Sequence, residues 1–95
     1  MTERAGRGVM PDMIRLRYFA SLRERLGMAD ESIPLPEAVT DAAGLRRWLQ
    51  GRGGIWSEAL SDQRLQVAIN QEIGKPGTPV RDGDEVAWFP PVTGG

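Results

Sequence analysis

The chain has 95 residues, which is the length of one small domain. Hydrophobic residues make up 40%, charged residues 26% and the formal net charge is −1, so the composition indicates a globular domain and argues against a dedicated nucleic-acid binder. Cysteine and histidine are both absent, which excludes disulfides, thiolate nucleophiles and the commonest general base and metal ligand. We therefore expect a protein that binds or carries something.

The chain divides into three predicted parts. Residues 1–12 are rich in glycine and arginine and predict a flexible N-terminal extension. Residues 13–90 carry the periodic patterns of a domain, and residues 91–95 form an extended C-terminal tail. Neither a signal peptide nor a membrane span is visible, so we expect a cytoplasmic chain that contacts no membrane and no nucleic acid.

The predicted strands come from alternating apolar and polar residues. This pattern covers residues 13–19, 65–70 and 85–89, and a very short strand is expected at 71–73. Residues 32–36 contain two prolines, which predict a short edge strand.

The predicted helices come from spacing and capping residues. Ser21 is expected to cap a short helix that Gly27 ends, and a helical turn is expected near residues 56–60. Thr40 is expected to cap the main helix, over residues 40–51. Leu45, Trp48 and Leu49 of that helix share one apolar face by their spacing.

Alternation also assigns residues to the two faces of the sheet. Three tryptophans are predicted in or beside the core: Trp48, Trp56 and Trp88. Three arginines are predicted on a solvated helix face: Arg46, Arg47 and Arg52. The outer face is predicted to hold Arg15, Arg17, Phe19, Gln66, Ala68, Asn70, Glu85, Ala87 and Phe89. Phe19 and Phe89 then lie at the ends of neighbouring strands, and such apolar patches mark partner surfaces.

These elements predict an α+β fold of the ubiquitin-like β-grasp type. A mixed sheet of four to five strands would pack on one main helix and one short helix, with the first strand beside the last and parallel to it.

The C-terminus is the sharpest chemical signal. Pro90 and Pro91 fix the backbone where the chain leaves the last strand, and Gly94 and Gly95 have no side chains, so the tail could enter a narrow cleft. The carboxylate of Gly95 is ionised at neutral pH and becomes an electrophile once adenylation by ATP supplies a leaving group. An inert tail is the alternative interpretation.

From residue 13 onward the chain resembles the small, sulfur-carrying subunit of molybdopterin synthase, the MoaD family, within the MoaD/ThiS ubiquitin-like sulfur carriers. The matching segments are Met13-Ile14-Arg15-Leu16-Arg17-Tyr18-Phe19-Ala20 with Leu22-Arg23-Glu24, then Val67-Ala68-Ile69-Asn70-Gln71, and Asp82-Gly83-Asp84-Glu85-Val86-Ala87-Trp88-Phe89-Pro90-Pro91-Val92-Thr93-Gly94-Gly95. The resemblance does not include residues 1–12.

The resemblance implies a role for the tail. An adenylyltransferase of the ubiquitin-activating type would use ATP to adenylate Gly95, and sulfur from a sulfurtransferase or cysteine desulfurase would turn it into a thiocarboxylate. The sulfur would pass to precursor Z (cyclic pyranopterin monophosphate) in the large catalytic subunit, in a heterotetramer of two carriers and two large subunits. The residues implied to insert there are Pro90, Pro91, Val92, Thr93 and Gly94.

The resemblance further implies that Phe19, Ile73 and Phe89 contact both the activating enzyme and the large subunit, and that the chain holds no permanent cofactor or metal. Three alternatives stay open: a carrier for thiamin or another pathway, a ubiquitin-like protein modifier joined to lysines through Gly95, and an interaction domain with an inert tail. The segment from Phe89 to Thr93 favours the molybdopterin branch, because thiamin carriers usually lack the paired prolines.

Overall fold

The first strand of the chain is an interior strand of a mixed sheet in the computed structural model, which describes residues 13–91. The elements are β1 (Met13–Tyr18), α1 (Ala20–Leu26), β2 (Asp30–Pro34), α2 (Ala42–Gln50), α3 (Ile55–Ala59), β3 (Gln66–Ile69), β4 (Glu72–Ile73) and β5 (Glu85–Phe89). Every predicted strand and helix is present, with ends that shift by one or two residues.

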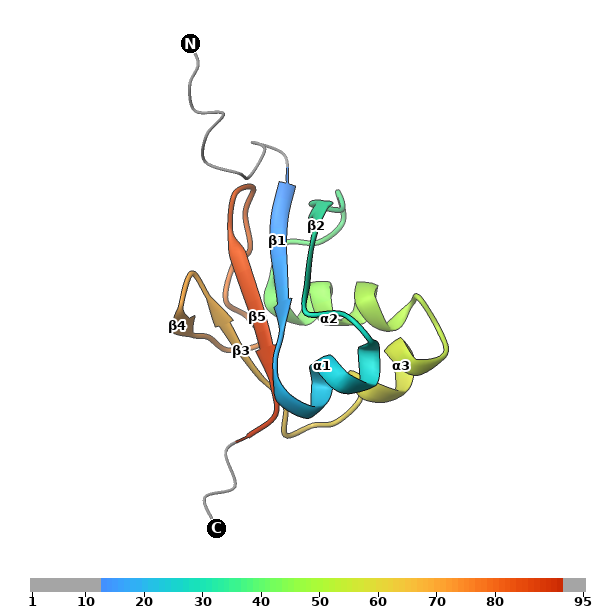
Figure 1. The fold of residues 1–95 in the computed structure, drawn as a ribbon. Helices are drawn as coiled ribbons and strands as arrows, with labels where there is room; N and C mark the ends of the chain where they lie inside the picture. The colour runs from blue at the N-terminus through green and yellow to red at the C-terminus, as the bar shows by residue number, and fades with distance from the viewer. Residues whose placement is uncertain (1–12, 92–95) are drawn as a thin grey trace.

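The sheet has the strand order β2-β1-β5-β3-β4. The first and last strands, β1 and β5, pair in parallel, and the other neighbours are antiparallel. This arrangement confirms the predicted ubiquitin-like β-grasp. Because β1 and β5 are parallel, their carboxyl ends lie at the same end of the sheet, next to α1 (Figure 1).

The core lies between one face of the sheet and the helices, which all cover that face (Figure 1). Alternate residues of the strands point into it, and Leu45 and Leu49 of α2 are fully buried against them. The fully buried strand residues include Ile14, Leu16 and Val86. Burial of this apolar surface is the main force that holds α2 on the sheet.

Trp48 differs from the prediction, because 40% of its surface is exposed. Leu45 and Leu49 occupy the line of α2 that faces the sheet, and Trp48 lies to one side of that line. Its ring instead packs against the guanidinium of Arg52, whose carbon lies 5.2 Å from the ring centre. Trp88 is buried and Trp56 is half-buried, as predicted.

The N-terminus of α2 is capped by Asp41, whereas the sequence predicted Thr40. The Asp41 carboxylate accepts a hydrogen bond of 2.8 Å from the Gly44 backbone amide. The backbone carbonyl of Thr40 accepts from Val80, and Asp41 forms a bridge with Pro79, so pairing with the 74–84 loop fixes where the helix begins.

The cap of α1 and the start of β2 also differ from the prediction. Phe19 occupies the cap position without a side-chain bond, and Ser21 lies inside the helix. The Phe19 amide donates to the Trp88 carbonyl, which prolongs the β1–β5 pairing before the chain turns at Ala20. Strand β2 lies at the sheet edge as predicted but begins at Asp30, because Arg17 pairs with Asp30.

Candidate functional site

Strand β5 ends at Phe89 because the next two residues are prolines. Proline has no backbone N–H, so Pro90 and Pro91 cannot continue the donor pattern of the ladder. Phe89 is the last paired residue of β5 and lies opposite Gln66 of β3. Both prolines are half-buried. The other predicted tail residues, Val92, Thr93, Gly94 and Gly95, lie outside the described residues.

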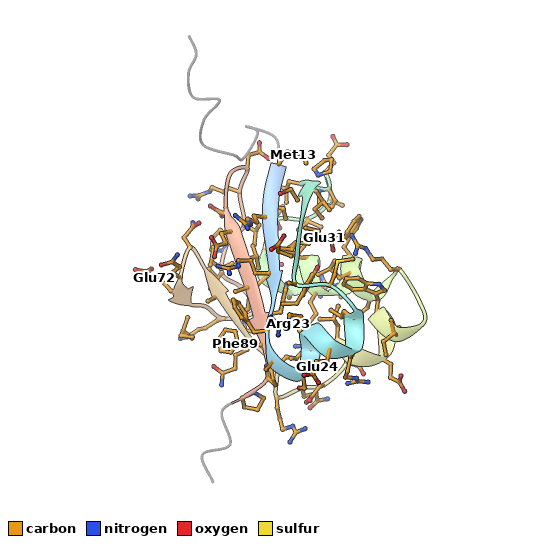
Figure 2. All side chains as sticks on the ribbon, viewed as in Figure 1. Met13, Arg23, Glu24, Glu31, Glu72 and Phe89 are labelled. Carbon is orange, nitrogen blue, oxygen red and sulfur yellow. The ribbon has the colours of Figure 1, made fainter. Side chains whose placement is uncertain are left out.

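Two of the predicted partner-binding residues come together at this end of the sheet. Tyr18 pairs with Trp88, so the following residues, Phe19 and Phe89, are neighbours where β1 and β5 end. Phe19 is exposed and Phe89 is half-buried. Figure 2 shows Phe89 at the end of β5, where the described chain leaves the sheet.

The third predicted residue, Ile73, lies on the same outer face. The strand registers place Arg17, Ala87, Ala68 and Ile73 in one row across β1, β5, β3 and β4. Side chains of paired residues point to the same face of a sheet. Ile73 is therefore on the outer face, where 69% of its surface is exposed.

Ala68 and Ala87 differ from the prediction that they face water. They point to the outer face, yet only 8% and 9% of their surfaces are exposed. A methyl group is shorter than the side chains around it, so the neighbours in the row cover both alanines.

The result is a shallow apolar surface, which we call the outer patch: Phe19, Ala68, Ile73, Ala87 and Phe89. Arg17 lies at its border. Its guanidinium carbon is 5.0 Å from the centre of the Phe19 ring, and its NH1 atom lies 3.5 Å from the Glu85 carboxylate. An apolar surface with a charged border is typical of a protein-binding site.

The sequence did not reveal a polar network on the helix side of the fold. The Tyr18 hydroxyl donates to Glu31 at 2.8 Å, and Arg52 donates to both oxygens of the same carboxylate at 2.8 and 3.2 Å. The Arg52 guanidinium also lies 4.4 Å from the centre of the Trp56 ring. Burial raises the pKa of Tyr18 well above its usual value, and the hydrogen bond to Glu31 raises it further.

Two arginines therefore differ from the predicted solvated helix face. Arg52 links β1, β2 and α3 through that network, and Arg46 donates to the backbone carbonyls of Leu60 and Asp62. No periodic signal could reveal these contacts, because their partners are distant in the sequence. Arg47 and Arg52 are both exposed as predicted, but of the two only Arg47 makes no ion pair with any residue of 13–91.

The acidic segment at residues 82–85 forms a turn, as its Asp-Gly sequence indicates. Asp84 accepts from the Arg81 amide and from the Asn70 side chain, and Gly83 adopts a positive φ of 89°. Within residues 13–91, no group of three or more acidic, histidine or cysteine residues is placed to hold a metal ion. No helix in this part of the chain is long and apolar enough to cross a membrane.

The described site thus offers an apolar surface next to Pro90 and Pro91, where the chain leaves the sheet. It holds no histidine or cysteine, since the sequence has neither.

Comparisons with known proteins support this description. The chain is 40% identical over 83 residues to the molybdopterin synthase sulfur carrier subunit of Haemophilus influenzae, covering 87% of this chain and 100% of that protein. A solved structure from Pyrococcus furiosus, described as a molybdopterin converting factor subunit 1, superposes with a TM-score of 0.68 at 26% identity and covers 84% of this chain and 98% of that one.

A second solved structure contains a partner. It is a complex of subunits 1 and 2 of the molybdopterin-converting factor from Helicobacter pylori, and its matched chain has a TM-score of 0.60 and 27% identity, covering 87% of this chain and 99% of that one. The sequence profile of the ThiS family matches residues 16–95, which includes the Gly-Gly terminus. The chain therefore belongs to the ThiS family of ubiquitin-like β-grasp proteins, to which the MoaD-type sulfur carriers are related.

Proposed function

We propose that this chain is the sulfur carrier subunit of a molybdopterin synthase. The observation that carries the proposal is the 40% identity to the Haemophilus influenzae carrier over that protein's whole length. The outer patch and the paired prolines at the end of β5 fit the same role, because they combine a docking surface with a stiff exit for the tail.

The proposed chemistry takes place at the Gly95 carboxylate. An adenylyltransferase of the ubiquitin-activating type transfers AMP from ATP to one carboxylate oxygen, and pyrophosphate leaves. A sulfurtransferase or cysteine desulfurase then supplies sulfur as a persulfide, whose terminal sulfur displaces AMP and forms an acyl disulfide at Gly95. A thiol reductant cleaves the S–S bond, which leaves a thiocarboxylate on Gly95 and a disulfide on the donor side. The thiocarboxylate sulfur attacks precursor Z, and hydrolysis returns an ordinary carboxylate at Gly95.

The outer patch is the proposed contact with both partners. Phe19, Ile73 and Phe89 would be covered by the large subunit of the synthase, and residues 90–94 would carry Gly95 into its active site. The Helicobacter pylori structure, which holds subunits 1 and 2 of the converting factor together, supports a large-subunit partner. We propose a heterotetramer with two carriers, in which the same patch binds the activating enzyme at an earlier stage.

Deletion of Gly95 tests this function in a reconstituted synthase. We expect the shortened chain to keep its fold and its affinity for the large subunit, because the outer patch is intact, while molybdopterin formation from precursor Z is lost. The full-length chain, loaded in parallel, is the control. Molybdopterin formation by the deleted chain would contradict the proposal, and isopeptide bonds from Gly95 to lysines of many proteins would favour a protein modifier.

A further inference from the structure

A cavity of about 550 Å³ lies between α2 and β3, on the side of the sheet opposite the outer patch. Its walls contain Val67 and Trp88, which point toward the helices. Arginines and glutamines supply the polar part of the wall, and no acidic residue of the described part of the chain lines it. These polar residues are Arg46, Arg47, Gln50, Gln63 and Arg64; Gln66 also borders the cavity, but its pairing with Phe89 places its side chain on the outer face.

The positive charge of this cavity is only partly compensated. Arg64 pairs with the Asp62 carboxylate, with Nε and NH2 at 3.1 and 3.2 Å from its two oxygens. Arg46 donates to the uncharged backbone carbonyls of Leu60 and Asp62, at 2.6 and 2.5 Å, so its charge is not paired there. Arg47 makes no ion pair with any described residue. Neither Arg46 nor Arg47 therefore makes an ion pair within residues 13–91, although the hydrogen bonds from Arg64 and, less strongly, the charge of Arg46 lower the pKa of the nearby Asp62 carboxylate, which pairs with Arg64.

The geometry of Arg46 favours binding, because its two bonds to carbonyls hold the guanidinium in place before a ligand arrives. A group fixed in advance loses less conformational freedom when it binds. The backbone amides at the start of α2 contribute nothing, since those of Ala42, Ala43 and Gly44 already donate to Thr78, Pro76 and Asp41. Binding must come from the side chains.

Trp88 adds an independent observation. It lines the cavity, and its buried Nε1–H has no hydrogen-bond acceptor among residues 13–91. An indole N–H is a donor only, and buried donors in folded proteins nearly always have a partner. An oxygen atom of a ligand in the cavity would supply the acceptor that the Trp88 Nε1–H lacks.

We propose that this cavity binds the phosphate group of a small phosphorylated molecule, at a site separate from the outer patch. Guanidinium forks match phosphate oxygens in pairs, and two unpaired arginines balance a dianion better than the single charge of a carboxylate. The glutamine amides can supply further donors to the remaining oxygens. The volume suits a small ligand.

Titration of the full-length chain with inorganic phosphate, followed by NMR of the indole N–H signals, tests the proposal. The chain has three tryptophans, and only Trp88 lines the cavity, so Trp48 and Trp56 serve as internal controls. We expect a saturable shift of the Trp88 signal, while chloride at matched ionic strength leaves it in place. Absence of a saturable shift, or an equal response to chloride or acetate, would overturn the proposal.

Two matched substitutions locate the binding. Arg47 and Arg23 are both exposed on helices, and Arg23 lies on α1 outside the cavity, so Arg47→Gln and Arg23→Gln remove the same charge from surface positions. We expect Arg47→Gln to weaken phosphate binding at least about fivefold and Arg23→Gln to change it by less than about twofold. Equal effects of the two substitutions would show general charge screening and contradict a site at the cavity.

Discussion

At the scale of single residues, the clearest prediction concerns Tyr18. Its hydroxyl donates to Glu31, and burial together with this bond raises its pKa above the usual value. A group whose pKa is raised in the folded state stabilises the fold fully at pH values below its pKa in the unfolded chain. This stabilisation is lost as the pH rises from the unfolded-state pKa through the folded-state pKa. The free energy of unfolding should therefore fall above about pH 10, where the unfolded tyrosine ionises.

This pH dependence can be assigned because the chain has one tyrosine. Absorbance of the phenolate should stay absent in the native protein above about pH 10 until the chain unfolds. In Tyr18→Phe, the free energy of unfolding should decrease much less as the pH rises. Normal phenolate formation in the folded protein would show that the hydroxyl is not held by Glu31.

Single residues also show where prediction from sequence stops. Alternation placed Ala68 and Ala87 on the correct face, but it could not show that longer neighbours cover them. The contact of Arg52 with Glu31 joins residues 21 positions apart, which no local pattern encodes. The fold decides which longer side chains lie beside the alanines and which distant residues pair with each other, so neither detail can be predicted from local sequence.

At the scale of elements, the order and type of strands and helices could be predicted because each buried face repeats with its own period. The residues at which helices and strands begin and end could be predicted less accurately. Thr40 and Asp41 are both good caps, and the pairing of the 74–84 loop with this segment selects Asp41. A distant segment therefore decided a local boundary.

Replacement of each candidate cap tests this boundary. Asp41→Ala removes the bond to the Gly44 amide and should lower the free energy of unfolding by about 1 kcal/mol. Thr40→Ala is the matched control and should cost less than about 0.5 kcal/mol, because Thr40 is exposed and contributes its backbone carbonyl. Denaturant unfolding of both variants measures this, and a larger loss for Thr40→Ala would contradict the capping role of Asp41.

Strands β3, β4 and β5 form the outer patch together with Phe19, which follows β1. We predict that substitutions in this patch weaken binding. Phe89→Ala should weaken the complex with the large synthase subunit by more than about 1 kcal/mol, because buried interface aromatics contribute strongly. Ile73→Ala should also weaken it, and this substitution spares the fold because Ile73 is mostly exposed. Ile55→Ala on α3 is the control, since Ile55 is exposed on the opposite side of the sheet.

Isothermal titration calorimetry gives the dissociation constants for these variants. Unchanged affinity of both Phe89→Ala and Ile73→Ala would remove the outer patch from the proposed interface. Equal weakening by Ile55→Ala would show that the effect is not specific to that face.

At the scale of the whole molecule, the proposed function separates recognition at the outer patch from chemistry at Gly95. The described sheet offers an apolar patch with two prolines beside it, and the last two residues of the sequence are glycines. The family could be predicted because the motif at residues 82–95 is long and specific. The contacts of Val92 to Gly95 could not, because they would form with partners.

Intact mass spectrometry of the full-length chain tests the reactive terminus most directly. The chain is incubated with ATP, the activating enzyme and a sulfur donor, and the chain that lacks Gly95 is treated in the same way. The account predicts that the full-length chain exchanges one terminal oxygen for sulfur only when ATP is present, and that the shortened chain keeps its mass. An unchanged full-length mass, or sulfur added to the shortened chain, would contradict it.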